Sequence, residues 1–539
     1  ADSDAHPMAV AAEPADSAAS ADAADKSIDL HAIQLHRLYT VIESQPKREQ
    51  ASMTLEDCVR TALSANQDIQ IASYEPLKAG ADVLSSYGEF DPMLQGNAQY
   101  LRSSQTTGAD VRTYTGGVTS IDAYRTNSNM TMNGKLPWGT QYQASFDLNH
   151  EETTFNRFFS EYSGGMTFSL SQPLLRGRGA SYNLTRIRIA KNTTQAAEDT
   201  LRVQVMTSVS NVVKGYWDLV GARQAMAVRR ESLANAERLL DINQKRFDIG
   251  IGSALEVVQA QAGVATRQSD YIAAISQVRD AEDRLKNELN AERTPDVWPK
   301  EIVPLNEPTP RDTKLDEEGS VVMAIENRPE VHQAKVNIES AKMQAKRAGM
   351  DMQPELNVSG QAFGGGRNHY AAKVVQNTLE AKDYSYGVGV DGSVPIGNRA
   401  ARGAYQRASL EVREAEDRLA RVKQQIVLNV RLALRAVETS RTLVESTRQA
   451  RALQETNVVA QEKRLKLGVT TSFEVLRTQE DLTVAQTQEV QALVNLEKAE
   501  TDLRLAEGIL LQDLGVTFEG VQPEKPVSFV RSVLPIPVE

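Results

Sequence analysis

The chain has 539 residues, of which 41% are hydrophobic and 24% are charged, so it can form roughly two or three ordinary domains and is not disordered throughout. Its formal net charge of −11 argues against nucleic acid as the main partner. A single cysteine, Cys58, excludes a disulfide framework within one chain, and the absence of any run of about 18 apolar residues excludes a predicted transmembrane helix.

Residues 1–50 form an N-terminal tail and the lead-in to the rest of the chain. The first thirty residues contain seven acidic side chains against one lysine, Lys26, among many alanines. They contain no aromatic residue and show no apolar periodicity. Such a segment cannot bury enough apolar surface to offset the entropy of ordering, so we expect 1–50 to be disordered.

A short helix is predicted next, opening near Ala62, and β-strands follow it over 89–172. Residues 87–172 contain 13 of the 29 aromatic residues of the chain. Over 142–149, apolar and polar residues alternate, which is typical of a strand with one apolar and one polar face. Strands of about 8–10 residues with this pattern suit a membrane barrel, and a soluble sandwich with one wet face is the alternative.

The strand region ends in an unusual run, SLSQPLLRGRG, over Ser169–Gly179. Pro173 cannot donate to a sheet ladder, and Gly177 allows the backbone to change direction. Arg176 stands where a membrane strand would meet lipid head groups or water. We interpret the run as a strand-to-helix joint with an architectural role, although an ordinary strand–loop–helix connection remains the alternative.

A long helix over 183–248 follows the joint. It contains no proline, and its 66 residues correspond to roughly 100 Å of helix. No compact domain has a core of that length, so the helix must pack lengthwise on other helices. Glycine is the usual C-terminal stop of a helix and serine can cap the next, which predicts a helical hairpin and a return helix over 253–290. The expected tip residues are Gly250, Ile251, Gly252 and Ser253.

The same order of elements recurs in the second half of the chain. Gly250 and Gly468 coincide at an offset of 218 residues, as do Glu256 and Glu474. This is the pattern of an internal duplication. The second copy has its joint at Pro395, Gly397 and Arg399 and its tip at Gly468, Val469, Thr470 and Thr471. Its elements are a helix over 329–350, strands over 354–396, a long helix over 402–467 and a return helix over 471–511. The predicted segments are repeat one at 51–296, an equatorial linker at 297–320, repeat two at 321–517 and a C-terminal tail at 518–539.

These motifs resemble those of the TolC-like outer-membrane efflux family. The resemblance rests on SQPLLRG at 171–177, the two tips, and the similar helix openers ALSANQDI at 62–69 and AIENRPEV at 324–331. It covers about 51–517. It implies an α+β membrane protein in which a trimeric outer-membrane β-barrel is continuous with a long periplasmic α-helical barrel, built from two internal repeats.

The resemblance also implies a function. The chain would be the exit duct of a tripartite efflux or type I secretion system, located in the outer membrane of a Gram-negative-type bacterium and extending into the periplasm. The implied partners are two further copies in a homotrimer, a periplasmic adaptor, an inner-membrane pump of RND or ABC type, and outer-membrane lipid. The tips would contact the adaptor. We expect no enzyme activity, cofactor, metal or nucleic acid.

Two features depart from the family pattern. Four strands are expected before Pro173, joined by a tight turn at 135–141 and by longer polar loops near 102–127 and 150–163, whereas the family usually supplies four strands per chain in all. Six strands would give about 18 in a trimer, but we favour a long external hairpin on a barrel of about 12 strands.

The second departure concerns the periplasmic gate. The family carries acidic residues at the second tip, and Glu474 keeps the first of them whereas Arg477 replaces the next. Glu256 is the counterpart in repeat one. Three copies of Glu474 would repel one another and could bind cations, Arg477 could neutralise Glu474 locally, and a solvated helix face is the alternative.

Other functions find little support. GVGVDG at 387–392 matches a dinucleotide-binding pattern but falls inside an alternating strand. The six histidines lack metal-ligand spacing. A long coiled-coil scaffold is the main alternative function, but a scaffold would not need duplicated aromatic strands.

Overall fold

The computed structural model describes residues 49–154, 157, 159–290, 298–309 and 315–516. Nearly all of the predicted tails at 1–50 and 518–539, and parts of the predicted linker, lie outside these residues. The chain divides into two compact units, the first formed by 1–65, 211–312 and 437–500 and the second by the remainder. Within the described ranges, every helix is too short or too polar to cross a membrane.

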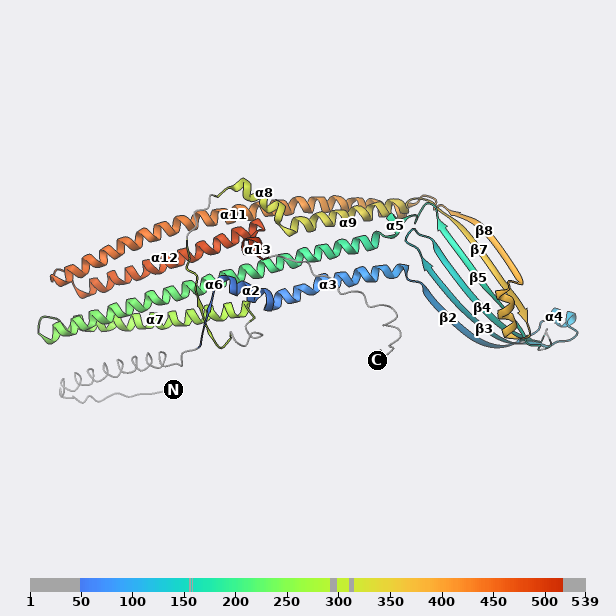
Figure 1. Ribbon diagram of the computed structural model, residues 1–539, viewed down its shortest axis with the longest axis horizontal. Coiled ribbons are helices and arrows are strands. Elements are labelled where there is room, and N and C mark those ends of the chain that lie inside the picture. Colours follow the sequence, from blue (N-terminus) through green and yellow to red (C-terminus); the bar gives the residue numbers. More distant parts are fainter. Residues whose placement is uncertain (1–48, 155–156, 158, 291–297, 310–314, 517–539) are drawn as a thin grey trace, which may run out of the picture. The chain divides into compact units, whose positions relative to one another are not determined.

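A six-stranded antiparallel sheet dominates the second unit (Figure 1). Its strands lie in the order β2-β3-β4-β5-β7-β8, so β2 and β8 are the two outer strands. The strands are β2 (Met93–Thr106), β3 (Ser120–Lys135), β4 (Gln141–Thr153), β5 (Glu161–Pro173), β7 (Glu355–Asn368) and β8 (Asp383–Ser393). β5 and β7, far apart in the chain, lie side by side and join the strands of the two repeats.

The expectation of an external hairpin is wrong. Every residue of β2 pairs with β3, from Met93 opposite Asn133 to Thr106 opposite Ser120, and β4 pairs with β3 and β5 along nearly its whole length. The strands are also longer than expected, and the loops between them are shorter. Backbone hydrogen bonds continue the ladder where both faces carry polar side chains, and there the alternation that predicts a strand disappears.

The two faces of the sheet differ in chemistry. Residues opposite each other in an antiparallel ladder share a face, so the row Phe146, Met166, Gly364 and Tyr384 lies on one side. We call this side the apolar face. It also carries Leu94, Met130, Met132, Tyr142, Leu148, Phe168, Leu170, Tyr386, Val388 and Val390. The opposite, polar face carries mainly amide and hydroxyl side chains such as Asn129, Ser145, Ser169 and Gln361.

Some helices of the structure were not predicted. α4 (Ala109–Tyr114) joins β2 to β3, and α8 (Glu317–Asn327) precedes the expected helix of repeat two. α10 (Ala371–Leu379) lies in the connection from β7 to β8 and folds back onto β5 and β7. α4 and α10 have no counterpart in the other repeat. α8 does have one, because the match of ALSANQDI with AIENRPEV aligns it with α2 (Leu55–Ala65), and each of the two helices is separated by one residue from the helix that follows it.

Four helices extend from the sheet in the second unit: α3 (Gln67–Tyr87), the first part of α6 (Thr185–Asp248), α9 (Pro329–Asp351) and the first part of α11 (Arg399–Lys466). Asn66 caps α3 by accepting hydrogen bonds from the backbone N–H groups of Asp68 and Ile69. Asn192 of α6 donates to Ser340 of α9 at 3.0 Å. A buried cluster that includes Val331, Ile426 and Val430 packs α9 against α11.

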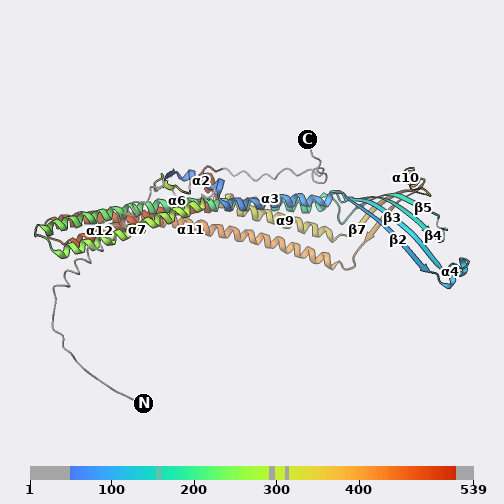
Figure 2. The same cartoon turned by 90° about the horizontal axis from the view of Figure 1, so that it is seen from below.

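The first unit contains the helical hairpins. α7 (Ala254–Glu288) runs back along α6, and α12 (Ser472–Glu507) runs back along α11 (Figures 1 and 2). The unit also contains α2 (Leu55–Ala65) and two short parallel strands, β1 (Gln50–Met53) and β6 (Glu301–Pro304). The hydroxyl of Tyr216 on α6 accepts hydrogen bonds from the backbone N–H groups of Leu305 and Asn306, which fixes the chain after β6 against the helices.

Candidate functional site

The first tip closes tightly between α6 and α7. Gly250 has φ +80°, a conformation that side chains other than glycine rarely adopt. The backbone N–H groups of Ile251 and Gly252 both donate to the carbonyl of Arg246, at 3.0 and 2.9 Å. A Cβ atom on Gly252 would lie 2.9 Å from the backbone nitrogen of Phe247. Ser253 caps α7 by accepting from the N–H of Leu255, so all four expected residues form this turn.

The second tip follows the same plan with one difference. Gly468 has φ +71°, and the N–H of Val469 donates to the carbonyl of Arg464 at 3.0 Å. The hydroxyl of Thr471 accepts from the N–H of Glu474 at 3.4 Å, so it caps α12 as expected. Thr470 stands where the first tip has Gly252, so the second turn leaves room for a side chain.

Buried polar contacts hold the two tips together. Ser472 donates from its hydroxyl to the side-chain oxygen of Asn243 at 2.9 Å, and both residues are fully buried. The amide nitrogen of Asn243 donates in turn to the carbonyl of Glu256. Leu239 of α6 and Val475 of α12 belong to one apolar cluster beside these contacts. The two hairpins therefore form one packed end.

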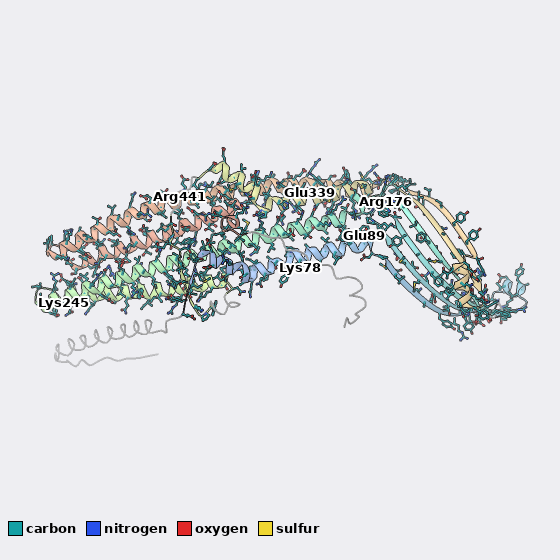
Figure 3. The ribbon with its side chains drawn as sticks, viewed as in Figure 1. Lys78, Glu89, Arg176, Lys245, Glu339 and Arg441 are labelled. Carbon is teal, nitrogen blue, oxygen red and sulfur yellow. The ribbon has the colours of Figure 1, made fainter. Side chains whose placement is uncertain are left out.

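An open groove of about 780 Å³ lies between α6 and the end of the second hairpin. Its charged lining is mainly basic, with Arg238, Arg246 and Lys466 against Glu462. Ile242 and Ile251 contribute exposed apolar side chains to it. In the side-chain view, Lys245 marks this end of α6 (Figure 3). The groove offers apolar surface with cations at its border, which suits a partner carrying apolar and acidic side chains.

A cluster of charges lies further along the hairpins, away from the tips. Glu480 of α12 contacts Arg229 of α6 at 3.4 Å and Arg267 of α7 at 3.6 Å. Burial lowers the pKa of Arg267, and the carboxylates of Glu480 and Asp270 oppose that shift. Arg267 also donates to the carbonyl of Leu476 at 2.8 Å. The cluster ties α12 to both helices of the first hairpin.

The expected gate residues lie near the start of the return helices. Glu474 and Arg477 are exposed on the first turns of α12, and Glu256 is half-buried at the same level of α7. Within the described part of the chain, Glu474 and Arg477 form no ion pair with each other. The local neutralisation that their spacing allows is therefore not observed in this structure.

The first joint is enclosed by its own chain. β5 ends at Pro173, as predicted. Arg176, which is labelled in Figure 3, forms an ion pair of 2.8 Å with Glu355 at the start of β7. The buried side chain of Asn183 donates to the carbonyls of Gly177 and Gly179, at 2.8 and 3.0 Å. The N–H of Gly179 donates to the carbonyl of Trp138, which places the tight turn at 135–141 against the joint.

The second joint is more open. β8 ends at Ser393, and Pro395 and Gly397 lie in the short connection before α11, which begins at Arg399. Gly397 has φ +86°, and the side-chain amide of Asn398 donates to the carbonyl of Met352 at 2.9 Å. Ile396 is fully exposed. The sequence therefore identified the prolines and glycines of both joints but missed Asn183 and Trp138, whose contacts depend on the fold.

In the described part of the chain, no group of three or more His, Cys, Asp or Glu side chains is arranged to hold a metal ion. GVGVDG lies inside β8, as expected, and does not open a helix.

The chain is similar in sequence to known outer-membrane proteins. Residues 58–291 and 321–508 match the Outer membrane efflux protein family. The outer membrane efflux protein BepC of Brucella suis is 22% identical over 442 residues, which are 80% of this chain and 91% of that protein. The pyoverdine export outer membrane protein OpmQ of Pseudomonas aeruginosa is 28% identical over 118 residues, which are 22% of this chain and 24% of OpmQ.

Solved structures share the fold. The CmeC outer membrane channel of Campylobacter jejuni has a TM-score of 0.61 and 16% identity, covering 85% of this chain and 86% of CmeC. The outer membrane protein VceC of Vibrio cholerae has a TM-score of 0.59 and 15% identity, covering 84% of this chain and 96% of VceC. The TolC-like resemblance and the location in the outer membrane are confirmed. The chain belongs to the outer membrane efflux protein family.

Proposed function

We propose that this chain is one third of an outer-membrane exit duct that receives substrates from a periplasmic adaptor and an inner-membrane pump of RND or ABC type. The observation that carries the proposal is the unfinished sheet of the second unit. Its outer strands β2 and β8 leave one row each of backbone N–H and C=O groups unpaired within the described chain. Hydrocarbon does not tolerate such edges, and six strands are too few to enclose a passage.

The helices support the same closure. α3 precedes β2, and it exposes Ile71, Tyr74 and Leu84. α11 follows β8, and it exposes Leu410, Leu428 and Leu432. Each outer strand of the sheet is therefore adjacent in the chain to a helix that exposes apolar side chains. Copies that join head to tail, β8 and α11 of one against β2 and α3 of the next, would cover both surfaces and close a ring.

Three copies of six strands would make a barrel of about eighteen strands. In that barrel the apolar face would meet lipid, and the amide and hydroxyl side chains of the polar face would line a water-filled passage. The helices would continue the passage as a periplasmic tunnel, with the tips at its entrance.

Disulfide cross-linking tests the closure. Each variant would carry one cysteine in β2 and one in β8 and would be oxidised in native membranes. The native Cys58 is buried and should not take part. The proposal predicts covalent ladders in SDS that stop at three chains. A sheet that closed on itself would give cross-linked monomers, and an open assembly would give ladders beyond three.

The adaptor is expected to dock at the two tips and in the groove beside them. Ile251 and Val469 are exposed apolar residues of the tips. Ile251→Asp or Val469→Asp should lower adaptor capture in cells by on the order of tenfold, because each change places a charge at the centre of a desolvated contact. Leu453→Asp, at an equally exposed apolar position of α11, is the matched control. Equal losses for all three variants would count against tip docking.

We further propose that Glu474, repeated in three copies, forms an anionic ring at the entrance. Glu474→Ala should weaken block of single-channel current by divalent cations, and Arg477→Ala should strengthen it. Glu256→Ala, at the repeat-one counterpart, tests whether any tip carboxylate acts in the same way. If Glu474→Ala left both conductance and cation block unchanged, Glu474 would belong to a solvated helix face.

A further inference from the structure

α10 lies on the apolar face of the sheet, at the end that is remote from the long helices. β7 begins just after α9 and β8 ends just before α11, whereas α10 follows Asn368 at the opposite end of β7. Gly164 pairs with Gly366, and Met166 pairs with Gly364, so these residues share the apolar face. Contact with these glycines therefore determines which side of the sheet α10 covers.

The contacts between α10 and the sheet are close. A Cβ atom on Gly164 would lie 3.0 Å from Val374, and one on Gly366 would lie 2.6 Å from Asn377. The hydroxyl of Thr378 donates to the carbonyl of Gly164 at 3.3 Å. Val374, Asn377 and Thr378 are the buried residues of α10. Glycines at these strand positions thus allow α10 to pack closely on the sheet, and larger side chains there would prevent this contact.

The opposite side of α10 is exposed and carries apolar residues, lysines, and the polar side chains of Gln376 and Glu380, where the Gln376 amide donates to the Glu380 carboxylate at 2.8 Å. Ala372, Val375 and Leu379 are apolar, and Leu379 is 77% exposed. Lys373 and, just beyond the helix, Lys382 are exposed cations. The Lys373 ammonium lies 5.8 Å from the centre of the Tyr370 ring, and the Lys382 ammonium lies 3.9 Å from the Glu380 carboxylate. An apolar surface flanked by lysine and tyrosine is typical of a helix lying in a membrane interface.

We propose that α10 is an outer-leaflet helix on the lipid side of the duct, where Val375 and Leu379 contact acyl chains and Lys373 and Lys382 bind the phosphate of a lipid head group. This rests on the proposed function, which places the apolar face in the membrane. The occupant is lipid because the exposed side of α10 continues the apolar face formed by Met166, Phe168 and Tyr384. Two lysines beside that surface match an anionic head group.

The orientation is tested by fluorescence quenching. Leu379→Cys would be labelled with bimane in the full-length protein and reconstituted with lipids brominated on their acyl chains. Phe168→Cys, on the apolar face, and Ser169→Cys, on the polar face, are the matched controls. The native Cys58 is fully buried, and burial raises its pKa to about 12, so it stays unlabelled.

Quenching at Leu379→Cys comparable to that at Phe168→Cys is expected, with little at Ser169→Cys. If Phe168→Cys were quenched and Leu379→Cys were not, the helix would face protein or water and the inference would fail while the duct survived. If Phe168→Cys resisted quenching as well, the membrane position of the sheet would fail and both proposals with it.

The phosphate contact is tested with bis-phosphorylated lipid A added to phosphatidylcholine nanodiscs, with bound lipid A counted by native mass spectrometry. The double variant Lys373→Gln/Lys382→Gln should bind lipid A on the order of tenfold more weakly than the unmodified chain. Lys78→Gln/Lys342→Gln removes the same charge from the exposed faces of α3 and α9 and should bind normally. Equal binding by all three proteins, or an equal loss in both variants, would overturn the phosphate contact.

Discussion

The two strand-to-helix joints share a sequence pattern but differ in how much of the surrounding structure comes from their own chain. The first follows β5, an interior strand that pairs with β7 on one side. Arg176, Asn183 and the turn at Trp138 enclose this joint. The second follows the outer strand β8, and its Ile396 is fully exposed. Duplication therefore supplied the same local turn twice, and the position in the sheet decided which copy the chain could cover by itself.

The largest effect is expected at the enclosed joint. Asn183→Ala removes the buried donor of two hydrogen bonds, to the carbonyls of the half-buried Gly177 and Gly179. It should lower the free energy of unfolding in detergent by about 3 kcal/mol, because two carbonyls that are partly shielded from water each lose a hydrogen bond.

Asn398→Gly is the matched change at the open joint. It removes one hydrogen bond, to Met352, but relieves a positive φ of 43°. It should change the free energy of unfolding by no more than about 0.5 kcal/mol, because the lost hydrogen bond and the relieved backbone strain have opposite effects. Equal destabilisation by the two substitutions would show that the joints do not differ in the way described.

The next effect concerns assembly rather than folding. If a second copy covers the open joint, Ile396→Asp should weaken association by about 2 kcal/mol for each contact, because it removes a large apolar side chain from a buried surface. The measurement is the ratio of trimer to monomer by light scattering in detergent. Tyr114→Asp, at an equally exposed residue of α4, should leave that ratio unchanged. A trimer insensitive to Ile396→Asp would mean that the second joint faces solvent in the assembly.

Local chemistry explains what could be predicted from the sequence. Gly250, Gly468, Ser253 and Thr471 stop and cap helices through bonds to residues within a few positions, so their roles are readable without the fold. Pro173 ends a strand for the same local reason.

Contacts between distant segments explain what the sequence could not reveal. Asn243 meets Ser472 across 229 positions, and Arg267 meets Leu476 across 209. α10 depends on glycines in two strands, Gly164 and Gly366, which by themselves weaken the strand pattern. The full lengths of β2 and β4 escaped prediction because polar side chains occupy both faces of each strand at its outer end, over 102–106 and 150–153.

The two helical tips, like the two joints, share a sequence pattern but differ in how closely their atoms pack. Gly252→Ala would place a Cβ atom 2.9 Å from the nitrogen of Phe247, and it should cost about 1.5 kcal/mol of local stability. Thr470→Ala, at the corresponding position of the second tip, should cost less than about 0.5 kcal/mol. Amide hydrogen exchange would be measured over residues 246–253 in the first variant and over 464–471 in the second, and the exchange should be faster than in the unmodified chain only in the first variant. Unchanged exchange would indicate that the first turn is no tighter than the second.

The smallest effect should come from the ion pair at the enclosed joint, even though its 2.8 Å geometry is good. The side chains of Arg176 and Glu355 are 40% and 38% exposed, so water and salt screen their attraction. A double-mutant cycle with Arg176→Ala and Glu355→Ala should give a coupling of no more than about 0.5 kcal/mol, falling further in high salt. A coupling several times larger and insensitive to salt would place the pair in a dry environment, such as a contact with a second copy. A second copy would then bury part of the first joint as well, and the two joints would differ less in how much of their surroundings comes from their own chain.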